Sequence, residues 1–88
     1  MRDKTLIPKR IDNFEAIDLS DGVVVKMNDI LHTLNSTAYE IFQLCDGQRT
    51  IQEIIDEMCV RYPDEEIATV IENFIDQLYS SELIRSLT

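Results

Sequence analysis

The chain has 88 residues, 44% of them hydrophobic and 28% charged, which indicates one folded domain with a single modest core. No apolar run approaches the roughly 18 residues of a membrane span, and the polar start MRDKTLIPKR lacks the apolar centre of a signal peptide. We therefore expect a cytoplasmic protein. The net charge of −9 disfavours nucleic acid and anionic membranes as partners and favours neutral or basic ones.

The N-terminal segment is basic and shows no clear periodicity. Four of the eight Lys and Arg residues lie within the first ten positions: Arg2, Lys4, Lys9 and Arg10. Pro8 indicates an extended backbone. We expect residues 1–12 to be a lead-in, either a loose tail or an arm packed on the body, and residues 13–88 to form the domain proper.

Three short strands are predicted next, at residues 14–19, 23–27 and 30–34. Ser20-Asp21-Gly22 is predicted to turn the chain between the first two, since Asp-Gly is a hairpin-turn signal and glycine accepts a positive φ. Asn28-Asp29 is predicted to make the second tight turn, because both side chains tolerate a left-handed backbone. The result is an antiparallel meander whose first and third strands lie at its edges.

The first helix is predicted to begin near Thr37 and to end at Asp46-Gly47. Thr37 and Glu40 have the spacing of a capping box, and glycine is preferred just past a helix end. Apolar residues at helical spacing form one stripe, consisting of Ala38, Ile41, Phe42 and Cys45. This stripe indicates an amphipathic helix.

Two further helices are predicted. Thr50 and Glu53 form a second capping box, Pro63 ends that helix, and Asp64 is expected to cap the third, over residues 65–80. Residues 81–87 are predicted to be either a short closing strand or a docked tail. The predicted class is α+β: a three-stranded antiparallel sheet followed by three helices, winged helix-turn-helix-like in arrangement.

Residues that carry catalysis or bind metals are scarce. The chain has no nucleophile elbow, glycine-rich phosphate loop or HExxH motif, and His32 is its only histidine. We expect Cys45 and Cys59 to be buried, reduced thiols, with a disulfide or a metal site as the alternatives. We therefore expect no catalytic residues, no metal and no enzyme activity.

The charge of the third helix opposes DNA binding. In a winged-helix protein this helix would enter the major groove, where phosphate contacts need cations. Its region is instead acidic, with Asp64, Glu65, Glu66, Glu72, Asp76 and Glu82 and no Lys or Arg before Arg85. The sequence therefore argues against a DNA-binding role for this helix.

On a helical wheel, the third helix has more apolar surface than a core-facing stripe needs. The predicted core stripe consists of Ile67, Val70, Ile71, Phe74 and Leu78. One flank adds Ala68, Ile75 and Tyr79, with acidic residues beyond it. This flank is either deeper core, covered in part by Leu83 and Ile84, or one wall of a groove. The free edge of residues 30–34 would supply the other wall and could take an added strand from a partner peptide.

Several short motifs occur in order along the chain. LNSTA, residues 34–38, opens the first helix, and DGQRTIQEI, residues 46–54, opens the second; Tyr62, Leu78 and the Leu83-Ile84 pair follow. In this order and spacing, over residues 14–85, the chain resembles the PqqD family. Glu82 stands where that family usually has glycine.

The resemblance implies a non-catalytic recognition element for ribosomally made, post-translationally modified peptides (RiPPs). Such a domain has a winged-helix-like fold, binds the leader region of a precursor peptide and presents it to a modifying enzyme, in the PqqD case a radical SAM protein. The leader is held as an added strand on the third strand, beside the third helix. No cofactor is implied for the domain itself.

The residues expected to bind the peptide combine the strand edge with the flank of the third helix, the helix positions being taken from the wheel. They are Ile30, Leu31, His32, Thr33, Leu34, Ala68, Ile71, Glu72, Ile75, Asp76 and Tyr79. Glu72 and Asp76 are expected to meet basic leader residues. Two other functions stay open: a winged-helix transcription regulator, and a structural subunit of a larger enzyme. The free strand edge permits a monomer or a dimer.

Overall fold

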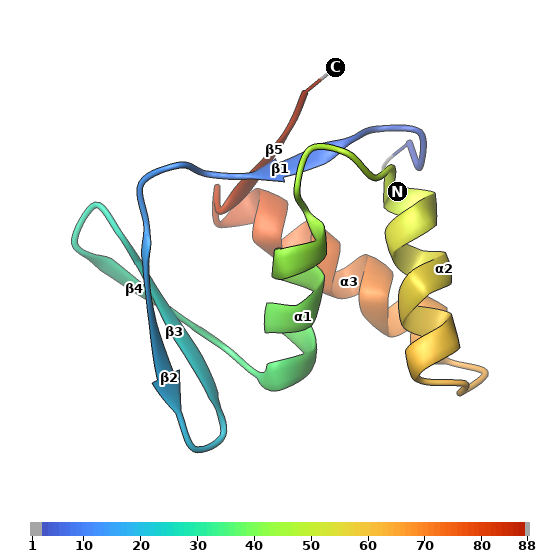
Figure 1. The fold of residues 1–88 in the computed structure, drawn as a ribbon, viewed down its shortest axis with the longest axis horizontal. Helices are drawn as coiled ribbons and strands as arrows, with labels where there is room; N and C mark the ends of the chain where they lie inside the picture. The colour runs from blue at the N-terminus through green and yellow to red at the C-terminus, as the bar shows by residue number, and fades with distance from the viewer. Residues whose placement is uncertain (1–2, 88) are drawn as a thin grey trace.

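The computed structural model describes residues 3–87 and places a small sheet against three helices (Figure 1). The strands β2 (Glu15–Leu19), β3 (Gly22–Met27) and β4 (Ile30–Leu34) form an antiparallel sheet in the order β2-β3-β4. The helices α1 (Ser36–Leu44), α2 (Ile51–Arg61) and α3 (Ile67–Ser80) follow. The predicted α+β class, a three-stranded antiparallel sheet followed by three helices, is confirmed.

The two hairpin turns of the sheet differ from each other. Asn28 and Asp29 have φ values of 51° and 65°, the left-handed backbone predicted for this turn. The first turn is made by Ser20 and Asp21, within the predicted Ser20-Asp21-Gly22 segment, but the positive φ predicted for Gly22 is wrong. Gly22 lies in β3, where a Cβ atom would come within 2.3 Å of the Leu34 carbonyl oxygen. The glycine is needed for this close approach of two strands and not for a positive φ.

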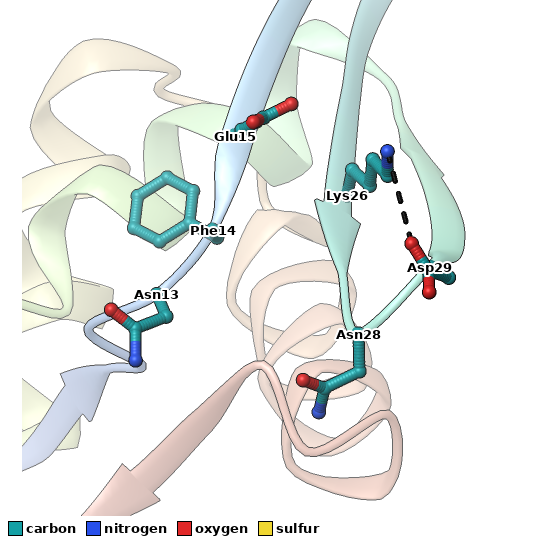
Figure 2. A pocket seen from close by; sticks show the side chains of 6 residues that line it. All are labelled: Asn13, Phe14, Glu15, Lys26, Asn28 and Asp29. Atoms are coloured by element: carbon teal, nitrogen blue, oxygen red, sulfur yellow. Dashed lines mark ion pairs between the residues drawn. The ribbon is translucent and has the colours of Figure 1, made fainter.

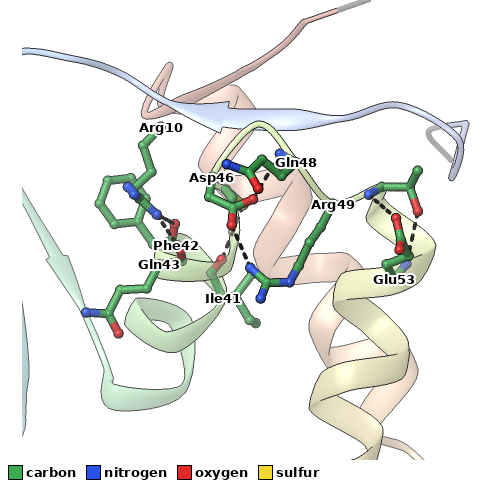
Figure 3. Close-up of polar contacts among 10 residues, drawn as sticks. Arg10, Ile41, Phe42, Gln43, Asp46, Gln48, Arg49 and Glu53 are labelled. Atoms are coloured by element: carbon green, nitrogen blue, oxygen red, sulfur yellow. Dashed lines mark hydrogen bonds and ion pairs between the residues drawn. The ribbon is translucent and has the colours of Figure 1, made fainter.

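The helix starts confirm one capping box and correct another. The Thr50 side chain accepts the Glu53 amide, and the Glu53 carboxylate accepts the Thr50 amide, which is the box predicted for α2 (Figure 3). For α1 the prediction of a Thr37–Glu40 box is wrong, because the Asn35 side chain caps the helix by accepting the Ala38 amide at 2.8 Å. Asparagine plays the same capping role two residues earlier in the sequence and accepts the amide of Ala38 in place of that of Glu40.

The third helix begins later than predicted. Asp64 accepts the amide of Glu66 at 3.0 Å, so it fixes the turn before α3, and the helix itself starts at Ile67 without a side-chain cap. At its other end, Glu82 has φ 60° while Glu82 and Leu83 donate to the Tyr79 and Leu78 carbonyls. These two bonds define a Schellman motif, which normally has glycine at the left-handed position.

The N-terminal arm is packed on the body. The strand β1 (Pro8–Arg10) pairs with β5 (Ile84–Ser86) as a separate two-stranded sheet across one end of the helices (Figure 1). The Arg10 guanidinium donates to the Phe42 and Gln43 carbonyls at the end of α1 (Figure 3). Of the two alternatives for each terminus, the structure shows the packed arm and the closing strand.

The segment before β1 also reaches α2. The Leu6 and Lys4 carbonyls accept the Ile51 and Gln52 amides at 2.9 and 3.1 Å, and these are first-turn amides with no partner inside the helix. The arm therefore satisfies exposed polar groups at the start of one helix and the end of another.

The core lies between the three helices and the inner face of the sheet. Its buried members include every residue of the stripe predicted for α1, together with Val23 and Val25 of β3. The helix α2 contributes Ile51, Ile54, Ile55 and Met58. Phe14 packs edge-on against Phe42 with ring centroids 5.2 Å apart. No helix in the described part of the chain is long and apolar enough to cross a membrane.

The buried face of α3 is rotated from the one predicted. Ile71, Ile75 and Leu78 are buried, whereas Val70 is 40% exposed, so the wheel assignment of Val70 to the core is wrong. The cause lies outside the helix. Lys4 of the arm and Ser86 of β5 contact α3 on the Ile75 side and cover that flank. The flank is thus deeper core, which is one of the two predicted alternatives.

Candidate functional site: the β4 edge and the cleft beside α3

The strand β4 is paired with β3 on one side, and on its other side it has no partner strand within residues 3–87. Met27 and Ile30 flank the two-residue turn, and in such a hairpin this pair exchanges both main-chain hydrogen bonds. Pairs alternate along the ladder, so His32 and Leu34 also direct their main-chain groups toward β3. The amides and carbonyls of Leu31 and Thr33 are therefore the ones that face outward along the free edge.

A cleft of about 290 Å³ opens between this strand and the C-terminal half of α3. Leu31, His32, Thr33 and Leu34 form the strand side, while Phe74, Gln77 and Ser81 form the helix side. The remaining lining residues, Ala38, Leu78 and Leu83, are buried and make the floor. The cleft thus combines outward main-chain groups with an apolar floor.

His32 lies on the inner face of β4, opposite the buried Val25 of β3. Its Nε2 atom is buried and has no hydrogen-bond partner among the described residues. Leaving a buried polar atom without a partner costs about 1–3 kcal/mol. A ligand in the cleft that offered a hydrogen bond to this atom would remove that cost.

The structure brings four of the five predicted strand residues to the cleft but none of the predicted helix residues. Ile30 is 57% exposed at the turn end of β4, beyond the residues that line the cleft. Ile71 and Ile75 are buried in the core, Ala68 packs against the core, and the Tyr79 hydroxyl lies 2.6 Å from Ser86 Oγ. None of these four helix residues lines the cleft.

The cleft-facing residues that the sequence did not predict recur along one face of α3 and its C-cap, Ser81. Phe74, Gln77 and Ser81 follow the i, i+3, i+7 spacing of a helix face and carry no charge. The signal in the sequence was that two uncharged polar residues, Gln77 and Ser81, share a helix face with the aromatic Phe74. A helical wheel considers only the hydropathy of the helix itself. It therefore predicted a groove wall on the flank of α3 that the arm and β5 cover.

The two residues of the predicted acidic lip lie outside the lining of the cleft. Glu72 is partly buried and forms an ion pair with Lys4 of the arm at 2.7 Å, and Asp76 is exposed. A basic partner side chain would compete with Lys4 for Glu72.

A second hollow, of about 410 Å³, lies at the other end of the sheet and is lined mainly by polar groups (Figure 2). Its one ion pair joins Lys26 and Asp29 at 3.9 Å. Among the described residues no group of three His, Cys, Asp or Glu side chains is placed to hold a metal ion. Cys45 and Cys59 are both free thiols.

These features define a class: a small α+β domain that presents an open strand edge beside a helix. The chain belongs to the PqqD family, because the family model described as coenzyme PQQ synthesis protein D (PqqD) matches residues 17–84. The resemblance noted in the sequence is thereby confirmed over the sheet, the three helices and the start of β5. No curated protein and no solved structure matches the chain.

Proposed function

We propose that this chain is a non-catalytic peptide-binding module that holds the leader region of a ribosomally made precursor peptide. The leader adds as a fourth strand to the free edge of β4, a mode of binding known as β-augmentation. The observation that carries the proposal is the outward main-chain row of Leu31 and Thr33 beside an apolar-floored cleft. Membership of the PqqD family supports the same role.

The proposed contacts keep the predicted strand residues and revise the helix wall. Ile30 to Leu34 supply the edge, and Phe74, Gln77 and Ser81 replace Ile71 and Ile75 as the contacting face of α3. Ala68, Ile71, Ile75 and Tyr79 act behind this wall, because they hold α3 in position against the core. Glu72 and Asp76 receive basic leader residues in exchange for the partners they have in the free chain, which for Glu72 is Lys4.

The module acts by raising the effective concentration of its peptide at a modifying enzyme. We propose a radical SAM protein or another maturase as this partner, and the cytoplasm, where ribosomes make the precursor, as the site of action. The order of the helices and the β3–β4 hairpin supports a winged helix-turn-helix-like arrangement. The acidic surface of α3 disfavours a DNA-binding role for it.

Proline substitutions test the proposed edge. Leu31→Pro and Thr33→Pro each remove an outward amide while sparing the bonds to β3, and each is expected to weaken binding of the precursor peptide at least about tenfold. Binding is measured by calorimetry with the precursor peptide whose gene lies beside the gene of this chain.

The opposite edge offers a matched control. By the same alternation, the amides of Ala16 and Asp18 face outward from β2, so Asp18→Pro makes the same change on the edge opposite β4 and its cleft. It should leave the affinity unchanged. Equal loss in all three variants, or no loss in any, would overturn the proposed binding mode.

A further inference from the structure

The outer face of the three-stranded sheet is apolar and uncovered. Cross-strand pairing places Ile17, Val24 and Thr33 in one row and Glu15, Lys26 and Leu31 in the next. Leu19 lies beside Gly22 on the same face. Ile17, Leu19 and Leu31 are 50%, 51% and 63% exposed, although inward-facing residues such as Val23 and Val25 are buried. We call Ile17, Leu19, Val24 and Leu31 the outer-face cluster.

The hairpin that carries this cluster stands away from the helices (Figure 1). All of β2 is exposed, and the helix that packs against the sheet, α1, contacts β3 and β4. Figure 2 shows Phe14 directed toward α1 and Glu15 directed away from it, so the two sides of the sheet are distinct. An apolar group on a projecting, uncovered surface is typical of a protein-interaction site.

The surrounding charge selects the kind of partner. From Glu15 to Asp29 the hairpin carries four carboxylates, and its single cation, Lys26, is paired with Asp29. Two copies of a chain with net charge −9 would bring these carboxylates face to face, which opposes self-association. A partner surface complementary to the outer-face cluster and its carboxylates has an apolar centre and a rim of Lys or Arg.

The outer face alone is small for an interface with a partner protein. Three strands of about five residues cover roughly 17 Å by 10 Å, far below the ~800 Å² per partner of a stable interface. A leader strand added to β4 would widen the sheet by about 4.8 Å and continue the same face with its own outward side chains. The complete docking surface is then shared between the domain and its peptide.

We propose that the outer-face cluster docks the modifying enzyme, through a surface of that enzyme that is apolar at its centre and basic at its rim. This inference rests on the proposed function for the identity of the partner. The peptide would be held on the edge of the sheet while the enzyme covers its outer face, so the two ligands bind side by side and do not compete.

The test measures both interactions separately with the purified maturase and the precursor peptide encoded beside the chain. The double variant Ile17→Lys/Leu19→Lys is expected to weaken enzyme binding at least tenfold while leaving the peptide Kd unchanged, since β2 is the strand farthest from the cleft. Ile17→Ser/Leu19→Ser should weaken enzyme binding in the same direction without adding charge. Circular dichroism confirms that each variant is folded.

Val60→Lys is the matched control, because Val60 is an apolar residue of α2 that is 79% exposed. It should change neither affinity. Unchanged enzyme binding in the Ile17 and Leu19 variants would overturn the inference, as would a wild-type dimer at micromolar concentration that the double variant abolishes. Absence of peptide binding to the wild type would instead contradict the proposed function, since enzyme binding is measured without peptide.

Discussion

Single residues in this protein hold conformations and ionisation states that their neighbours impose. Glu82 is the clearest backbone case, because it occupies the left-handed position of the Schellman motif at the end of α3. A residue with a Cβ atom pays about 1–2 kcal/mol there relative to right-handed backbone, whereas glycine does not. The packing of Leu83 in the core holds this turn in place.

Glu82→Gly is therefore expected to raise the free energy of unfolding by about 1 kcal/mol, measured by urea denaturation. Glu82→Ala serves as the control, since it removes the carboxylate but keeps the Cβ atom, and it should give no comparable gain. Equal stabilisation by both substitutions would show that charge, and not backbone strain, sets the effect.

Cys45 is the clearest ionisable case. Burial raises the pKa of its thiol to about 12, with Asp46 adding to the effect and Arg10 opposing it. The thiol also donates to the Ile41 carbonyl at 3.2 Å. Cys45 is therefore protonated and shielded at neutral pH, whereas the second thiol, Cys59, is partly exposed.

At pH 8 we expect one thiol of the native protein, Cys59, to react with a disulfide reagent such as DTNB, and Cys45 to react only on unfolding. Above pH 9 the unfolded state loses the Cys45 proton while the native state keeps it. Stability should thus fall by about 1.4 kcal/mol per pH unit from this group between pH 9 and 12. Cys45→Ala should lack this part of the slope; an identical slope would contradict the assignment.

At the scale of elements, the N-terminal arm connects parts of the fold that the chain leaves far apart. β1 pairs with β5, and Arg10 donates to carbonyls at the end of α1. The Lys4 and Leu6 carbonyls accept hydrogen bonds from amides at the start of α2. The arm thus joins both termini and two helices through polar groups that would otherwise have no partner.

Arg10→Ala is expected to lower the free energy of unfolding by about 1–2 kcal/mol, because it leaves the Phe42 and Gln43 carbonyls without a charged donor. Arg85→Ala is the matched control, since Arg85 is an exposed arginine of the paired strand β5. Thermal unfolding of both variants checks the prediction. Equal loss in both would mean that the carbonyl contacts of Arg10 add nothing to stability.

The elements that the sequence predicted well are those with local signals. The β3–β4 turn depends on Asn28 and Asp29 themselves, and the start of α2 depends on Thr50 and Glu53 three residues apart. Pairing of β1 with β5 escaped prediction because it joins the two ends of the chain through three-residue strands, which are too short to show a period. Long-range pairing of this kind leaves no local pattern.

The same distinction explains the candidate site. The free edge of β4 follows from strand order, which short turns fix, so residues 30–34 were placed correctly at the edge. The face of α3 that meets the cleft depends on which neighbours cover the other flank, and these are the arm and β5. The position of Phe74, Gln77 and Ser81 at the cleft therefore depends on the packing of the arm and β5, and the sequence of α3 alone does not predict it.

At the scale of the whole molecule, the domain has two surfaces with different chemistry that meet at β4. One edge of the sheet offers main-chain groups above an apolar floor, and the outer face offers apolar side chains within an acidic rim. The helices pack against the other face of the sheet. This arrangement suits a module that holds one partner while it docks on another.

The most direct test of the central claim is a titration of the isotope-labelled chain with its precursor peptide, followed by amide chemical shifts in NMR spectra. We predict a 1:1 complex whose largest shifts fall on Leu31, Thr33 and their neighbours in β4, with smaller ones at Phe74 and Gln77 of α3. The amide chemical shifts of Ala16 and Asp18 on the opposite edge should not change. If the peptide binds and the amide chemical shifts of β4 do not change, the account is contradicted.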